Sequence, residues 1–160
     1  MQKEQLRQQL KDLAFSAVLP DQVLEQIVAV SSVIDFPAGT VMFREGSVTR
    51  TLYIIYRGGV ALEMCVPARG CVRLLSLGPG DMVAWSALLG QGEMTTTAVA
   101  IEDTQTIAIS APKLLEICEM NHEVGYQVMR RMAQALSQRL VATRLQLLDL
   151  YSTESPAVES

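Results

Sequence analysis

The side chains with the clearest potential for chemistry lie between Gly78 and Ala100, in the stretch GPGDMVAWSALLGQGEMTTTAVA. It contains Trp85, the only tryptophan of the chain, then Ser86 and three threonines at 95–97. An indole ring can stack on a flat ligand, and hydroxyls donate and accept hydrogen bonds. No lysine, arginine or histidine occurs from Leu74 to Pro112. This stretch by itself therefore suits a neutral or weakly charged small molecule better than an anion.

Residue counts argue against catalysis and metal binding. The chain has one histidine, His122, near an expected helix start, where a cap or surface role is the ordinary one. Histidine-rich metal sites, catalytic Ser-His-Asp or Cys-His groups and haem or iron–sulfur centres all need more ligands or partners than this. We expect a protein that is not an enzyme and has no cofactor and no metal.

The three cysteines are an odd number, which argues against a disulfide framework and suits a reducing compartment. Cys65 and Cys71 flank the turn in CVPARGC, so a hairpin could bring them together as a redox switch. The alternative is two apolar thiols on adjacent strands. Cys118, in an apolar helical stretch, is expected in the core.

Length and charge limit the remaining classes. A chain of 160 residues with 49% hydrophobic residues fits one domain. Its net charge of -4 gives no attraction for a polyanion, so nucleic acid is not expected as a partner of this chain alone. The polar N-terminus and the lack of a long apolar run predict no membrane partner and a cytoplasmic location.

Several elements must position residues 78–97, the ligand cassette proposed from these side chains. Helices are predicted over 2–13 and near 21–30, with Asp21 as the N-cap of the second. From Ser31 the pattern changes to short β-branched or apolar segments separated by glycine and proline turns, which predicts seven or eight strands. These form a jelly-roll-like β-barrel with flanking helices, mainly β in class. The predicted strands are SSVIDF (31–36), TVMF (40–43), TLYIIY (51–56), GVALEMCV (59–66), CVRLLSL (71–77), TTTAVAIE (95–102) and TQTIAIS (104–110).

The strongest periodic signal predicts a C-terminal helix from Glu123 to Leu150, about 40 Å long at 1.5 Å per residue. Apolar residues recur at alternating spacings of three and four, and a second apolar flank includes Val128, Met132 and Ala135. One face can then dock on the barrel while the other pairs with a second copy, although the helix could also fold back on its own barrel. The predicted homodimer interface consists of Met129, Ala133, Leu136, Leu140, Leu147 and Leu150.

The predicted domain covers residues 1–151, with helices at 2–30, the barrel at 31–110 and helices at 111–151. Residues 152–160 are expected to be a disordered tail. Nine residues after Tyr151 are too few for a helix-turn-helix module with a basic face. We therefore expect either a stand-alone regulatory module without a DNA-binding domain or a piece of a longer regulator.

The segments FPAGTVMFREG, LYIIYRGGVALE, LGPGDMVAWSALLG and MRRMAQALSQRLVATRLQLLDLY occur in an order that resembles the cyclic-nucleotide-binding-domain superfamily. The resemblance is to the regulatory half of catabolite activator-type transcription factors, and it covers residues 6 to 151. AWSALL resembles a GWSALL variant of the ligand cassette that lacks the usual recognition residues.

The resemblance also implies which positions meet a ligand. In members that bind cyclic nucleotides, a glycine-glutamate pair holds the ribose, and an arginine followed by a hydroxyl residue and alanine holds the phosphate. Ala84 and Trp85 stand at the first pair, and Thr95, Thr96 and Thr97 stand at the second set. The family's C-terminal helix meets the base, and this implies ligand contacts for Thr143 and Arg144. Arg57 and Arg73 are the other candidate cations.

Two functions follow from these expectations. In the first, the chain is a small-molecule sensor whose pocket includes Ala84, Trp85, Ser86 and the threonines, and it signals to an unknown protein partner through the dimeric helix. In the second, Trp85 fills the pocket, and the chain is a constitutive dimeric interaction module without a ligand.

Overall fold

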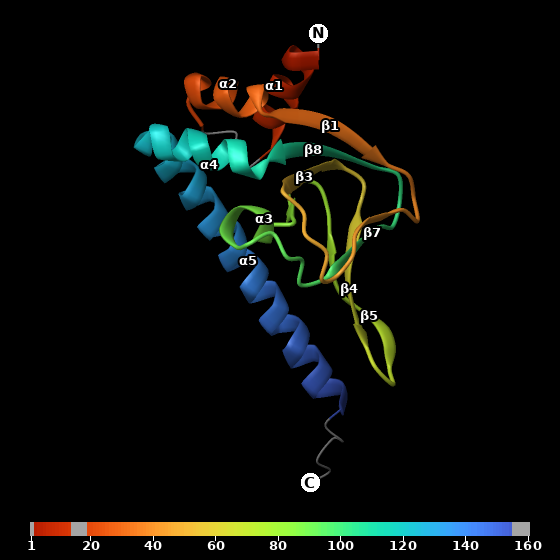
Figure 1. The fold of residues 1–160 in the computed structure, drawn as a ribbon. Helices are drawn as coiled ribbons and strands as arrows, with labels where there is room; N and C mark the ends of the chain where they lie inside the picture. Colours follow the sequence, from red (N-terminus) through yellow and green to blue (C-terminus); the bar gives the residue numbers. More distant parts are fainter. Residues whose placement is uncertain (1, 14–18, 155–160) are drawn as a thin grey trace.

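The computed structural model describes residues 2–13 and 19–154 of the chain, and two antiparallel four-stranded sheets form its centre (Figure 1). One sheet has the order β1-β8-β3-β6 and the other has the order β2-β7-β4-β5. The architecture is the predicted mainly β, jelly-roll-like class, although the two sheets do not close into a barrel. The strands are β1 Ser31–Phe36, β2 Val41–Phe43, β3 Thr51–Arg57, β4 Val60–Val66, β5 Gly70–Leu77, β6 Met82–Val83, β7 Thr97–Ala100 and β8 Thr104–Ser110.

The helices lie before, within and after the strands. They are α1 Gln2–Asp12, α2 Asp21–Ala29, α3 Ser86–Leu89, α4 Ala111–Met120 and α5 His122–Glu154. Figure 1 shows α1, α2 and α4 gathered at one end of the sheets, while α5 runs the length of the molecule. Cys118 of α4 is buried, as predicted, and Val128 and Met132 bury the first half of α5 in the same core.

The core is aliphatic because leucine, isoleucine, valine and alanine supply most of its buried side chains. In β3 and β8, the central strands of one sheet, Ile54 and Ile107 face each other in register and are fully buried. This packing fixes the sheet from which β6 and the following cassette extend.

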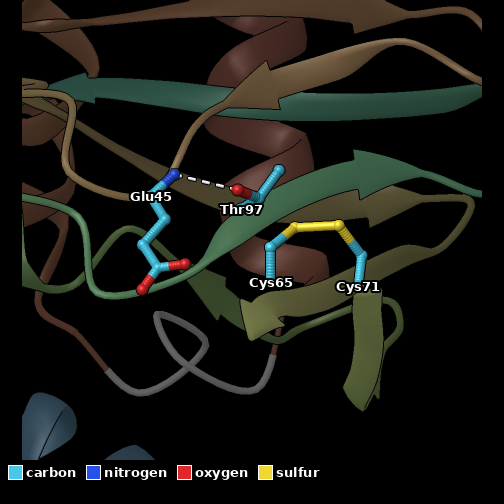
Figure 2. The surroundings of a disulfide bond; sticks show 4 residues. All are labelled: Glu45, Cys65, Cys71 and Thr97. Atoms are coloured by element: carbon cyan, nitrogen blue, oxygen red, sulfur yellow. Dashed lines mark hydrogen bonds between the residues drawn. A yellow bond between two sulfur atoms is a disulfide. The ribbon is translucent and has the colours of Figure 1, made fainter. Parts of the chain in front are cut away.

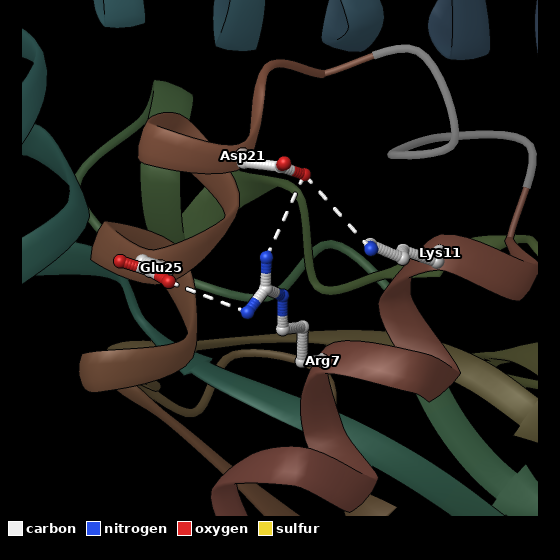
Figure 3. Close-up of polar contacts among 4 residues, drawn as sticks. All are labelled: Arg7, Lys11, Asp21 and Glu25. Carbon is white, nitrogen blue, oxygen red and sulfur yellow. Dashed lines mark ion pairs between the residues drawn. The ribbon is translucent and has the colours of Figure 1, made fainter.

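The start of α2 differs from the prediction. Pro20 occupies the N-cap position, and Asp21 is the first residue of the helix, with no side-chain capping hydrogen bond. The Asp21 carboxylate instead forms ion pairs with Arg7 at 3.7 Å and with Lys11 at 3.9 Å, and Arg7 also contacts Glu25 at 3.3 Å (Figure 3). An acid in the first turn interacts favourably with the helix dipole while it pairs with α1.

Two other boundaries were predicted wrongly. Thr95 and Thr96 lie outside β7, because the chain bends there and pairs with β4 only from Thr97. Helix α5 continues through residues 152–154, which were predicted to be disordered, and no proline or glycine lies between Gly125 and Pro156 to end it earlier. Residues 155–160 lie outside the described part of the chain. Within the described residues, no helix has the length and apolar character needed to cross a bilayer.

Candidate functional site

A tight turn positions the cassette, which we define as residues 78–97. Gly78 accepts a hydrogen bond from the amide of Asp81 at 3.1 Å and donates its own amide to Asp81 Oδ2 at 2.8 Å. Gly80 has a φ of 91°, a left-handed conformation that favours glycine at the third position of a turn. The turn leads into β6, where Met82 pairs with Ile54 of β3. The cassette is therefore anchored to the core on its N-terminal side.

Ala84 connects β6 to the short helix α3 in an unusual conformation. Its φ is 68°, in the left-handed region where alanine is uncommon, and its side chain is buried. The resemblance places a glycine at this position, and glycine adopts this backbone without a steric cost. Ala84 thus adopts a backbone conformation that glycine favours, and Trp85 follows it directly as the N-cap of α3.

A pocket of about 370 Å³ lies between the cassette, the β4–β5 hairpin and α5. Trp85 is half-buried, packs against the core and lines this pocket. The pocket volume lies at the small end of the range for ligand pockets in proteins. The lining residues are Leu62, Val72, Arg73, Leu74, Leu75, Trp85, Thr95, Thr96, Arg139, Thr143, Gln146 and Leu147.

The positive charge of the pocket comes from outside the cassette. Arg73 of β5 is exposed, whereas Arg139 of α5 is half-buried and donates a hydrogen bond from Nη2 to the carbonyl oxygen of Met82. Burial lowers the pKa of Arg139 because the charged form loses solvation, and the nearby Asp81 carboxylate partly opposes this. Two guanidinium groups therefore line a site whose central segment has no basic residue.

The structure brings four of the eight predicted ligand residues to this pocket: Trp85, Thr95, Thr96 and Thr143. Ser86 is buried beside them in α3, and neither Ser86 nor Ala84 is among the lining residues.

The two other predicted residues are oriented differently. The Thr97 hydroxyl accepts a hydrogen bond from the Glu45 amide at 2.9 Å (Figure 2). Arg144 is exposed on α5 and does not line the pocket. Arg57, another candidate cation, lies 5.6 Å from the ring centre of Tyr56, outside the pocket.

The reasoning from sequence missed Arg139, and a signal for it was present. The buried positions of α5 recur at Val124, Val128 and Met132, with Ala135 also packed against the core. Continuing this spacing by four residues reaches Arg139. An arginine on the docking face of an amphipathic helix indicates a polar contact inside the fold.

The β4–β5 hairpin contains a covalent link, although the odd cysteine count argued against a disulfide framework. Cys65 and Cys71 are register partners and form a disulfide (Figure 2). The count was misleading because two of three cysteines can pair locally while the third, Cys118, stays buried in α4. Val72 and Arg73 follow Cys71 directly and line the pocket, so the disulfide closes the hairpin beside the candidate site.

The second half of α5 carries apolar side chains that the described chain does not cover. Of the predicted interface residues, Met129 packs partly against the core, Leu136 is half-buried, and Leu147 lines the pocket. The Leu150 side chain lies outside the described part. The remaining predicted positions, Ala133 and Leu140, are exposed, and so are Val141, Leu145 and Leu148.

A family model, two curated relatives and a solved structure point to one family. The model of the cyclic nucleotide-binding domain matches residues 33–121. The cyclic AMP receptor protein of Thermus thermophilus is 32% identical over 119 residues, which are 74% of this chain and 53% of that protein. A CRP-like cAMP-activated global transcriptional regulator of Mycobacterium tuberculosis is 29% identical over 77% of this chain and 53% of its own length. The chain thus spans about half the length of these curated relatives.

A solved structure shows the same fold. A protein of Geobacter metallireducens, named for cyclic nucleotide binding, superimposes with a TM-score of 0.74 at 29% identity. The match covers 88% of this chain and 98% of that one.

Proposed function

This chain belongs to the cyclic nucleotide-binding domain family, and from that membership we propose that it is a non-catalytic regulatory module that binds a small molecule. The observation that carries the proposal is the pocket, where Trp85 and Thr95 of the cassette meet Thr143 of α5. A ligand there contacts both the cassette and the long helix, so its binding energy can favour one arrangement of the two.

Classical recognition of cyclic AMP or cyclic GMP is not part of the proposal. The Thermus and Mycobacterium relatives are named for cyclic AMP, and the resemblance assigns ribose and phosphate binding to a glutamate and an arginine of the cassette. Trp85 and Thr95 stand at those positions here. Without the carboxylate, a buried ribose hydroxyl loses its charged acceptor, which weakens nucleotide binding.

We further propose that the module works as a homodimer in the cytoplasm and passes its state to a protein partner through α5. Leu140, Val141 and Leu148 are exposed along the second half of this helix, which the described sheets do not cover. An exposed apolar helix face is stabilised when an identical face packs against it.

Intrinsic fluorescence tests ligand binding, because Trp85 is the sole tryptophan. We expect at least one compound from a metabolite panel to change its emission and raise the melting temperature, since a ligand at one hundred times its Kd stabilises a protein by about 2.7 kcal/mol. Trp85→Ala should remove the thermal shift, whereas Leu89→Ala, an exposed change at the end of α3, which follows Trp85, should keep it. If no compound changes emission or melting, the ligand-free interaction module is the better description.

Light scattering tests the dimer. Leu140→Glu combined with Leu148→Glu places like charges on the proposed interface, so we expect the mass to fall from that of two chains to that of one. Met120→Glu is the matched control, because Met120 is exposed at the end of α4. A wild-type protein with the mass of one chain contradicts the dimer proposal, and so does a double variant that retains the mass of two.

A further inference from the structure

The charged side chains that line the pocket beside Trp85 are both cations. Arg73 approaches from β5 and Arg139 from α5, and none of the lining residues is a carboxylate. Glu63 is the register partner of Arg73 on β4, and Asp81 lies near Arg139, yet neither is a lining residue. The net charge of the lining is therefore positive, opposite in sign to that of the whole chain.

Arg139 is the more confined of the two cations. It is half-buried, and one of its donors is committed to the Met82 carbonyl oxygen. A guanidinium has five N–H donors in a planar fork, so donors remain for a second acceptor. An anion placed against Arg139 restores electrostatic stabilisation that burial has removed.

The rest of the pocket is mostly apolar. Leu62 and Leu75 pair across the β4–β5 hairpin, and Trp85 faces the same space from the cassette. Away from the two arginines, a ligand body rich in hydroxyls loses water and finds few polar partners, among them Thr95, Thr96 and Gln146. A ring or hydrocarbon body gains from burial against the apolar side chains. The six apolar lining residues are Leu62, Val72, Leu74, Leu75, Trp85 and Leu147.

We infer that the ligand class is an organic carboxylate with an apolar ring or chain, its charged group held by Arg73 and Arg139 and its body stacked near Trp85. The inference rests on the proposed small-molecule function and gives that function a chemical class. An anion can then bind although the cassette contains no cation of its own, because Arg73 of β5 and Arg139 of α5 supply the charge.

Calorimetric titration with two matched probes tests the inference. The probes are 2-naphthylacetate and the neutral 2-naphthylacetamide, which share one apolar body and differ in charge, and cyclic AMP is the third ligand. We expect the carboxylate to bind at least about tenfold more tightly than the amide, the range of a charge-assisted hydrogen bond. We also expect the carboxylate to bind more tightly than cyclic AMP.

Variants then identify which arginine side chains bind the carboxylate. Arg73→Met should weaken carboxylate binding about tenfold and leave amide binding unchanged, because Arg73 is exposed and its loss does not disturb the core. Arg69→Met is the matched control on the same hairpin, since Arg69 is exposed and does not line the pocket. Arg139→Lys keeps a charge but loses the fork, so carboxylate affinity should fall while the melting temperature changes little.

The outcomes separate this inference from the proposed function. Equal affinities for carboxylate and amide overturn the anion class and leave small-molecule binding intact. Tighter binding of cyclic AMP than of naphthylacetate overturns the apolar class in favour of a nucleotide. If neither naphthyl probe binds, the class is wrong, and the Trp85 fluorescence panel alone decides whether any ligand exists.

Discussion

The guanidinium of Arg139 on α5 donates a hydrogen bond to the carbonyl oxygen of Met82 on β6. Met82 is buried and follows the turn that anchors the cassette, and Arg139 also lines the pocket. One side chain thus joins the long helix, the start of the cassette and the space for a ligand. A change at any of these three places alters the surroundings of the other two.

Removing this link should destabilise the fold. Arg139→Met keeps an apolar stem of similar length but leaves the Met82 carbonyl without its charged donor, so we expect the free energy of unfolding to fall by about 1–2 kcal/mol. Arg144→Met, an exposed change further along the same helix, should alter it by less than about 0.5 kcal/mol. Urea denaturation measures both variants, and equal effects would show that the Met82 contact contributes nothing to stability.

The disulfide of the β4–β5 hairpin should stabilise both the fold and the pocket. Cys65 and Cys71 are six residues apart. Closing a loop of that size lowers the entropy of the unfolded chain and stabilises the folded state by about 2 kcal/mol. We therefore expect a dithiol reductant to lower the melting temperature and to weaken ligand binding, because pocket residues 72–75 follow Cys71. The Cys65→Ser, Cys71→Ser double variant is the control, and its melting temperature should not respond to the reductant. A wild-type protein that melts identically with and without reductant contradicts this prediction.

The strand pattern could be predicted well where local signals were strong. The predicted segments 31–36 and 104–110 coincide with β1 and β8, because β-branched residues are frequent in both segments. The two-residue strand β6 carries no periodicity, and its pairing with β3 is a long-range contact. The β propensity of Thr95 and Thr96 likewise did not predict the bend that takes them out of β7.

The candidate site was predicted in part for the same reason. The resemblance placed Trp85, Thr95 and Thr143 on the pocket because those positions follow from the order of the elements. Arg73 and Arg139 reach it through packing between a hairpin and a helix far apart in the sequence. The spacing of α5 indicates only that Arg139 faces the core, and the pocket that Arg139 and Arg73 share depends on tertiary contacts.

The buried thiol of Cys118 should make stability depend on alkaline pH. Burial, assisted by the nearby Glu119, raises the pKa of this thiol above its ordinary value of 9.0. In the unfolded chain the thiol ionises near that ordinary value, whereas in the folded chain it stays protonated. Its stabilising contribution is therefore complete below about pH 9 and is lost as the pH rises through the folded pKa.

Chemical denaturation at pH 8.0 and pH 9.5 checks the Cys118 effect. We expect the wild-type free energy of unfolding to fall over this interval more than that of Cys118→Ala, which has no thiol to ionise. Tyr53, whose pKa burial also raises, is present in both proteins, so the difference between them isolates the thiol. Parallel pH curves for the two proteins would refute the assignment.

Replacing each of two alanines that follow a proline with glycine should change the free energy of unfolding in opposite directions. Ala68 has a φ of 80° in the turn closed by the hydrogen bond from the Arg69 amide to the Val66 carbonyl at 3.1 Å. In the turn from Pro37 to Thr40, Gly39 has the positive φ and Ala38 does not. We expect Ala68→Gly to raise the free energy of unfolding by about 0.5–1 kcal/mol, because glycine adopts the left-handed backbone without steric strain. We expect Ala38→Gly to lower it by about 0.5 kcal/mol, because glycine there adds conformational freedom only to the unfolded chain. Urea denaturation of the disulfide-bonded proteins measures the two changes, and a shift of the same sign in both would mean that backbone conformation at Ala68 does not limit stability.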